Sequence, residues 1–195
     1  PYGHEAVSVL GWIAGATTTL GLGSCVLAMP GRTPTMTAQA AATLDMISDG
    51  RFQLGLGLSG PQVSEGWHGV AFDRPLARTR DYVAVVRSAL RREVVRHDGE
   101  TLQLPLPGGG GKPLKMILTP LRADVPILLA ALGPRSVALA GEIADGWVPL
   151  WFSPEHAAEL CAPFVAGAEQ AGRVPGRIVP MVPVRIDDDL STALD

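Results

Sequence analysis

Hydrophobic and polar positions follow two different patterns along the chain. Five short segments are apolar almost without interruption, which is typical of strands covered on both faces of a parallel sheet. We predict these strands over residues 19–26, 51–57, 125–132, 146–151 and 177–186. Elsewhere apolar residues recur every three or four positions, which indicates helices with one buried face. We predict these helices over residues 5–15, 34–47, 77–92, 133–143 and 153–172.

This alternation of helix and strand indicates a parallel α/β architecture. It fits either an open, doubly wound sheet or part of a TIM (β/α)8 barrel. A complete barrel takes roughly 250 residues, and five strands are too few to close one. The chain has 195 residues, opens on a helix and begins a further helix within residues 187–195. We therefore expect one partial α/β domain over residues 1–195, with loop or insertion regions at 58–76 and 97–124.

Composition and charge narrow the possible functions. The chain is 47% hydrophobic and 18% charged, which is typical of a globular protein and excludes bulk disorder. A net charge of −3 argues against a nucleic-acid partner, which would need a basic face. The densest arginine cluster lies on the helix at 77–92 and is interrupted by Asp81. We interpret that cluster as a solvated helix face.

One uncharged segment, residues 6–31, is long enough for a transmembrane helix. Thr17–Thr19, followed by Gly21 and Gly23, would break such a helix near its middle. We therefore predict no membrane contact.

The two cysteines, Cys25 and Cys161, are far apart and lack the spacing of a metal site. Both lie in apolar segments. We therefore predict two buried, reduced thiols, a cytoplasmic location and no bound metal.

The stretch LGLGLSG spaces Gly55, Gly57 and Gly60 as in a dinucleotide-binding turn. In that turn a helix follows the glycines at once, whereas Pro61 and a long loop follow them here. We therefore reject a dinucleotide turn. Glycines at a strand end instead leave room for a flat ligand or for a neighbouring backbone.

Three predicted strands end in small, polar or glycine-rich residues, at positions 22–24, 55–60 and 131–134. The carboxyl ends of parallel strands are where α/β proteins bind ligands. The sequence therefore predicts a ligand site at this edge of the sheet.

Four longer stretches carry a resemblance to a known family. They are TLGLGSCVLAMPGRTP, AATLDMISDGRFQLGLGLSGPQVSEGWHG, PLARTRDYVAVVR and PILLAALGPRSVALAGEIADGWVP. Together they resemble the bacterial luciferase-like family, and within it the coenzyme F420-dependent oxidoreductases. Matching motifs run in order from residue 2 to about residue 189, so the resemblance spans nearly the whole chain.

The resemblance implies a TIM barrel in which the five strands are the third through the seventh, and hence a truncated chain. It also implies a non-proline cis peptide bond at the end of the first of these strands, between Cys25 and Val26. Relatives often have Gly or Ser where this chain has Cys25.

The family holds a deazaflavin or flavin ring at the carboxyl mouth of the barrel. By resemblance, the cofactor is coenzyme F420, with flavin mononucleotide (FMN) as the alternative, and a phosphate binds at the start of the helix at 133–143. The residues implied to contact the cofactor are Ser24, Cys25, Val26, Ser59, Gly60, Pro61, Gln62, Leu132, Gly133, Pro134, Arg135 and Ser136.

Hydride transfer from a reduced deazaflavin needs a proton donor near the site. Glu65 and His68 are the titratable side chains of the glycine-rich loop, with Trp67 between them. We predict that Glu65 or His68 acts as a general acid. The competing interpretation is that both residues stabilise a long loop by hydrogen bonds.

The resemblance implies an oxidoreductase that transfers hydride between F420 and a small organic substrate, in a possible homodimer. Two alternatives stay open at this point. One is an FMN-dependent monooxygenase on the same barrel, and the other is a non-catalytic flavin-binding or inactive barrel fragment.

Overall fold

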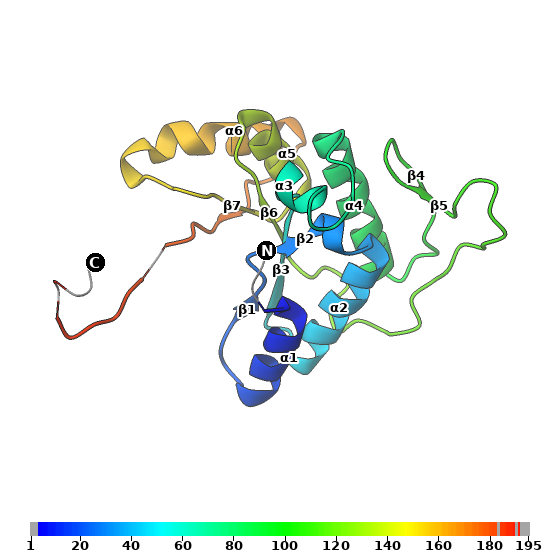
Figure 1. Ribbon diagram of the computed structural model, residues 1–195, viewed down its shortest axis with the longest axis horizontal. Helices are drawn as coiled ribbons and strands as arrows, with labels where there is room; N and C mark the ends of the chain where they lie inside the picture. Colours follow the sequence, from blue (N-terminus) through cyan, green and yellow to red (C-terminus); the bar gives the residue numbers. More distant parts are fainter. Residues whose placement is uncertain (1–3, 183, 190, 192–195) are drawn as a thin grey trace.

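A parallel sheet forms the centre of the molecule (Figure 1). The computed structural model describes residues 4–182, 184–189 and 191. The strands lie in the order β1 (Leu22–Gly23), β3 (Phe52–Gly57), β6 (Ile127–Ala130), β7 (Gly146–Val148) and β8 (Arg177–Ile178). A sixth strand, β2 (Leu27–Ala28), pairs with the carboxyl end of β3, and all these pairings are parallel.

Helices connect the strands and cover one side of the sheet. The long helices are α1 (Ala6–Ala16), α2 (Pro34–Ile47), α4 (Pro75–Leu90), α5 (Pro134–Ile143) and α6 (Ala157–Gln170). Helices α2, α4, α5 and α6 follow one another around the sheet in chain order (Figure 1). Strand order and helix placement are those of part of a (β/α)8 barrel, which confirms the predicted α/β class.

Local sequence signals explain where these helices begin. Thr33 caps α2 by accepting a hydrogen bond from the Met36 amide at 3.2 Å, and Pro34 occupies the first helical position. Pro75 and Pro134 occupy the same position in α4 and α5, where no amide hydrogen is needed.

The core lies between β3 and the helices. Phe52, Leu54 and Leu56 alternate along β3 and have no exposed surface. On α4, Tyr82, Val86, Ala89 and Leu90 recur at helical spacing and are buried, in agreement with a helix that has one buried face. Helices α2 and α4 are joined within the core by a hydrogen bond of 2.6 Å between the Thr37 and Tyr82 hydroxyls.

Two predicted strands differ from those observed. Within the segment 19–26 only β1 forms, β2 lies just beyond it at Leu27–Ala28, and the Cys25–Val26 peptide bond between the two strands is cis, as the resemblance implied. Among the described residues of the segment 177–186, the strand is confined to β8, which pairs with β7 and is followed by Pro180, a residue without an amide hydrogen to donate. The chain after β8 runs away from the sheet (Figure 1). Most of the helix expected within 187–195 lies outside the described residues.

The two regions expected to be loops contain regular elements. Residues 58–76 include the short helix α3 (Pro61–Ser64) and the start of α4. Residues 97–124 include an antiparallel pair, β4 (His97–Asp98) and β5 (Gln103–Leu104). Short 3-10 turns also lie at Met29–Gly31 and Pro154–His156.

Asp81, which interrupts the arginine cluster predicted to be a solvated helix face, is itself buried. Its residue surface is 7% exposed, because the β4–β5 hairpin folds back over this part of α4. The prediction of two buried thiols is wrong: Cys25 is exposed and Cys161 is half-buried, and both are free. Within the described part of the chain, no helix has the length and apolar character needed to cross a bilayer.

Candidate functional site

A cavity of about 690 Å³ lies at the carboxyl ends of four parallel strands. Its walls come from β2 and the residues before it, from the turn after β3, and from the segments that follow β6 and β7. The start of α4 closes another side. Ligands bind at this edge in parallel α/β proteins, so this cavity is the candidate functional site.

The lining is mostly apolar. Among the lining residues that the structure describes, Arg135 alone carries a charge, and the backbone and small side chains supply most of the other polar atoms. A site of this kind can hold a flat apolar ring and fix its orientation with a few hydrogen bonds.

The glycines of β3 make room for a neighbouring backbone. A Cβ atom at Gly55 would lie 1.8 Å from the Ser24 carbonyl oxygen, and one at Gly57 would lie 2.7 Å from a Val26 methyl group. Ser24 is buried, and its hydroxyl donates to the Gly55 carbonyl at 2.8 Å and accepts from the Gly55 amide at 2.9 Å. The segment from Ser24 to Val26 is thereby held against β3, with Cys25 and Val26 at the cavity wall.

The amino-terminal end of α5 forms a second part of the wall. Gly133 is its N-cap residue, and the Ser136 hydroxyl donates to the Gly133 carbonyl at 2.8 Å. The first amides of a helix have no acceptor within the helix and carry a partial positive charge. With the exposed Arg135 beside them, these amides can bind an anion such as a phosphate group.

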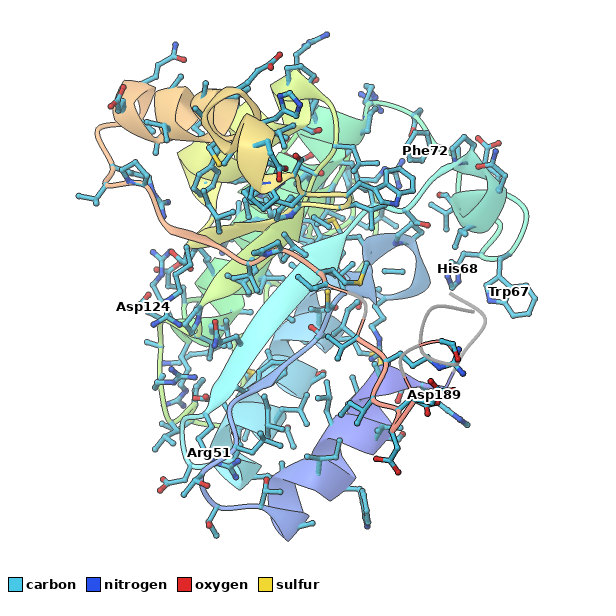
Figure 2. The ribbon with its side chains drawn as sticks, turned by 90° about the vertical axis from the view of Figure 1, so that its left-hand side faces the viewer. Arg51, Trp67, His68, Phe72, Asp124 and Asp189 are labelled. Carbon is cyan, nitrogen blue, oxygen red and sulfur yellow. The ribbon has the colours of Figure 1, made fainter. Side chains whose placement is uncertain are left out.

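The predicted catalytic residues, Glu65 and His68, do not line the cavity. Glu65 ends α3, and its carboxylate accepts a hydrogen bond from the Phe72 amide at 2.9 Å. The His68 ring packs against Gly31. Figure 2 shows Trp67 and His68 below α3 and Phe72 above it.

The predicted cofactor residues divide into two groups. Those that line the cavity are Cys25, Val26, Ser59, Leu132, Gly133, Pro134, Arg135 and Ser136. Ser24, Gly60, Pro61 and Gln62 do not line it. Ser24 lies behind the wall, and the other three belong to the start of α3, where Gly60 is the N-cap residue and Pro61 and Gln62 are exposed.

Sequence reasoning missed the wall formed by Phe72, Pro75, Leu76 and Thr79. Leu76 and Thr79 continue the apolar face of α4 toward the start of the helix. Following the same helical repeat further in that direction would have found them. The segment Val148–Leu150 begins at the last residue of β7 and could have been found by the same strand-end argument as the glycine-rich ends.

A polar cluster outside the cavity lining joins α4 to the β4–β5 hairpin. The Asp81 carboxylate accepts hydrogen bonds from the Thr101 amide and hydroxyl, both at 2.7 Å, and lies 3.0 Å from His97 Nε2. Burial, the largest influence, opposes ionisation of Asp81, but the bonds from Thr101 and His97 together outweigh it and lower the pKa of the carboxyl. No group of three or more His, Cys, Asp or Glu among the described residues could hold a metal ion.

Comparison with known proteins shows which family this chain matches. The model of the luciferase-like monooxygenases matches residues 1–195. A Mycobacterium tuberculosis protein that carries the provisional name coenzyme F420-dependent oxidoreductase is 51% identical over 161 residues, which are 80% of this chain and 46% of that protein. The chain thus spans about half the length of this relative.

Solved structures give the same picture. The coenzyme F420-dependent tetrahydromethanopterin reductase of Methanopyrus kandleri superposes with a TM-score of 0.76 at 25% identity, over 98% of this chain and 58% of that one. An F420-dependent secondary alcohol dehydrogenase superposes with a TM-score of 0.85 at 21% identity, with the same two coverages, and shows the fold alone. On the match along its whole length, the chain belongs to the luciferase-like monooxygenase family.

Proposed function

We propose that this chain forms the cofactor-binding part of an oxidoreductase that uses coenzyme F420 and acts on a small organic substrate. The observation that carries the proposal is the apolar cavity at the carboxyl ends of the strands, bordered by the start of α5 and Arg135. The 51% identical relative, whose name includes coenzyme F420, favours the deazaflavin over FMN.

The residues present fit such a cofactor. A deazaflavin has a flat apolar ring and a phosphate, and the cavity offers an apolar wall and a helix start next to an arginine. Cys25, Val26 and Ser59 would lie against the ring, and Leu132–Ser136 would hold the phosphate. When bound and reduced, the cofactor supplies a hydride to an electrophilic carbon of the substrate.

The chain's own contribution is to hold the ring, to exclude water and to orient the acceptor. Phe72, Leu76 and Leu139 supply apolar surface that keeps water out of the cavity. The general acid stays a prediction. Glu65 and His68 are the residues expected for it, and both would need to act from outside the described lining.

A titration of the 195-residue chain with F420 and with FMN, followed by fluorescence quenching, tests the proposal. We expect saturable binding of F420 and much weaker binding of FMN. Arg135→Gln removes the charge beside the start of α5 and is expected to weaken F420 binding by about three- to tenfold. Arg96→Gln, at an exposed arginine that does not line the cavity, is the matched control and should leave the affinity unchanged.

Each other outcome contradicts the proposal in its own way. Tight binding of FMN without binding of F420 would support the monooxygenase alternative. Binding of neither cofactor, together with the absence of a cooperative thermal transition, would support an inactive barrel fragment.

A homodimer and a cytoplasmic location stay predictions, and sedimentation analysis of the same sample tests the first.

A further inference from the structure

We propose that Glu65 is a positioning residue that holds the Phe72 wall of the cavity through the backbone. The proposal rests on the proposed function in so far as the cavity receives the cofactor. This positioning role explains why a glutamate lies in the glycine-rich loop, and it requires no proton transfer by the Glu65 side chain.

The loop between β3 and α4 returns on itself through paired hydrogen bonds. The Val70 amide donates to the Ser64 carbonyl at 2.9 Å, and the Ser64 hydroxyl donates to the Val70 carbonyl at 2.6 Å. Two residues further along, the Phe72 amide donates to the Glu65 carboxylate at 2.9 Å. The end of α3 is thereby joined to the returning segment at Val70 and at Phe72.

This joining decides where the loop meets the cavity. Phe72 is half-buried and lines the cavity together with Pro75, Leu76 and Thr79. Glu65 itself is exposed and outside the lining, on the outer side of the same loop. Its carboxylate therefore acts on the cavity only by fixing the Phe72 backbone, at the point where the chain leaves the loop and enters α4.

The chemistry of the contact separates this role from that of a general acid. An amide oxygen can accept the Phe72 N–H bond as a carboxylate does, so Glu65→Gln keeps the contact while it removes the titratable proton. Glu65→Ala removes both the contact and the proton. A positioning residue is rescued by glutamine, whereas a general acid is not.

Amide hydrogen exchange gives a readout that needs no turnover. In Glu65→Ala, we expect the Phe72 amide to exchange about tenfold faster or more, because its acceptor is gone. In Glu65→Gln, we expect exchange close to that of the unchanged chain. Glu169→Ala, at an exposed glutamate on α6, is the matched control and should leave the Phe72 amide unaffected.

The second readout is affinity for F420, measured by fluorescence quenching. Glu65→Ala should weaken binding by about three- to tenfold, and Glu65→Gln should restore most of the loss. In a Phe72→Ala background, Glu65→Ala should weaken F420 binding little further, because the hydrogen bond to the residue 72 amide acts on the cavity only through the Phe72 side chain, which is then absent.

The outcomes separate this proposal from the proposed function. If Phe72 exchange is unchanged in Glu65→Ala, or if glutamine and alanine weaken F420 binding equally, the positioning role is wrong. Normal binding with loss of turnover in Glu65→Gln would restore the general-acid assignment and overturn our proposal. If the unchanged chain binds no F420, the proposed function fails, while the exchange measurement still decides whether Glu65 holds Phe72.

Discussion

At Gly55, the lack of a side chain permits two segments of backbone to touch. The Ser24 carbonyl occupies the space that a Cβ atom would need, and the Ser24 hydroxyl bonds both the amide and the carbonyl of Gly55. A glycine pattern that looks like a nucleotide fingerprint is therefore a backbone contact beside the cavity. The glycine spacing alone could not distinguish room for a flat ligand from room for a neighbouring strand, because both need a position without side-chain atoms.

Gly55→Ala is expected to lower the free energy of unfolding by about 3 kcal/mol or more, because backbone must move to admit the methyl group. Gly21→Ala is the control: a Cβ atom there has no neighbour within 4 Å, and we expect a change within about 0.5 kcal/mol. Urea denaturation measures both. Equal stability of the two variants would contradict the contact.

At the scale of elements, single polar side chains join helices and loops that are not connected by the hydrogen bonds of the sheet. Arg51 donates to the Ala14 and Thr17 carbonyls, at 3.1 and 2.6 Å, and so caps the carboxyl end of α1. Arg122 pairs with the fully buried Asp45 of α2. Asp81 holds the β4–β5 hairpin on α4. Helical periodicity placed the helices well but gave no information on these links, because each partner lies 16 or more residues away and on a different element.

The Asp81 cluster predicts an acid-dependent loss of stability. The folded state lowers the pKa of Asp81 below the value of about 3.9 of an unfolded chain, so the unfolded chain takes up the proton first as the pH falls. The contribution is complete above about pH 5 and is lost as the pH falls through the folded-state pKa.

Asp81→Asn should therefore destabilise the chain by about 1–3 kcal/mol at pH 7 and should have a smaller effect at pH 3. Thermal denaturation over this pH range measures the difference. A destabilisation that stays constant from pH 7 to pH 3 would show that the charge of Asp81 is not involved.

At the scale of the whole molecule, Asp145 connects the sheet with α4 and with the segment after α6. Its carboxylate accepts hydrogen bonds from Arg87 of α4 at 2.9 Å, from Arg173 after α6 at 3.2 Å, and from the Ile127 amide at the start of β6 at 2.9 Å. This hub lies at the end of the sheet opposite the cavity, so it stabilises the frame while the carboxyl ends of the strands carry the candidate site. The division is that of a TIM barrel.

Asp145→Ala should lower the free energy of unfolding by about 2–4 kcal/mol, because two arginines and one strand amide lose their shared acceptor. Hydrogen exchange should accelerate at the end of α4, at the Ile127 amide and after α6 together. Asp124→Ala, at an exposed aspartate labelled in Figure 2, is the matched control. Faster exchange at only one of the three places would contradict a common hub.

The sequence by itself determined the order of the main helices and strands, the parallel α/β class and the edge of the sheet where the cavity lies. These properties follow from local periodicity and from the position of small residues at strand ends, which a single chain displays directly. The motifs also identified the family, because long stretches that match it lie in the same order along the chain.

Only the tertiary structure decided which of the predicted residues reach the cavity. It placed Arg135 at the wall and Glu65 outside it, and it brought in Phe72 and Thr79 from a neighbouring segment. It also buried Asp81, which lies among arginines in the sequence, and exposed the thiol of Cys25, which lies among apolar residues. The physical reason is that burial depends on what folds back over a residue, and a hairpin or a loop that does so leaves no periodic trace at the position that it covers.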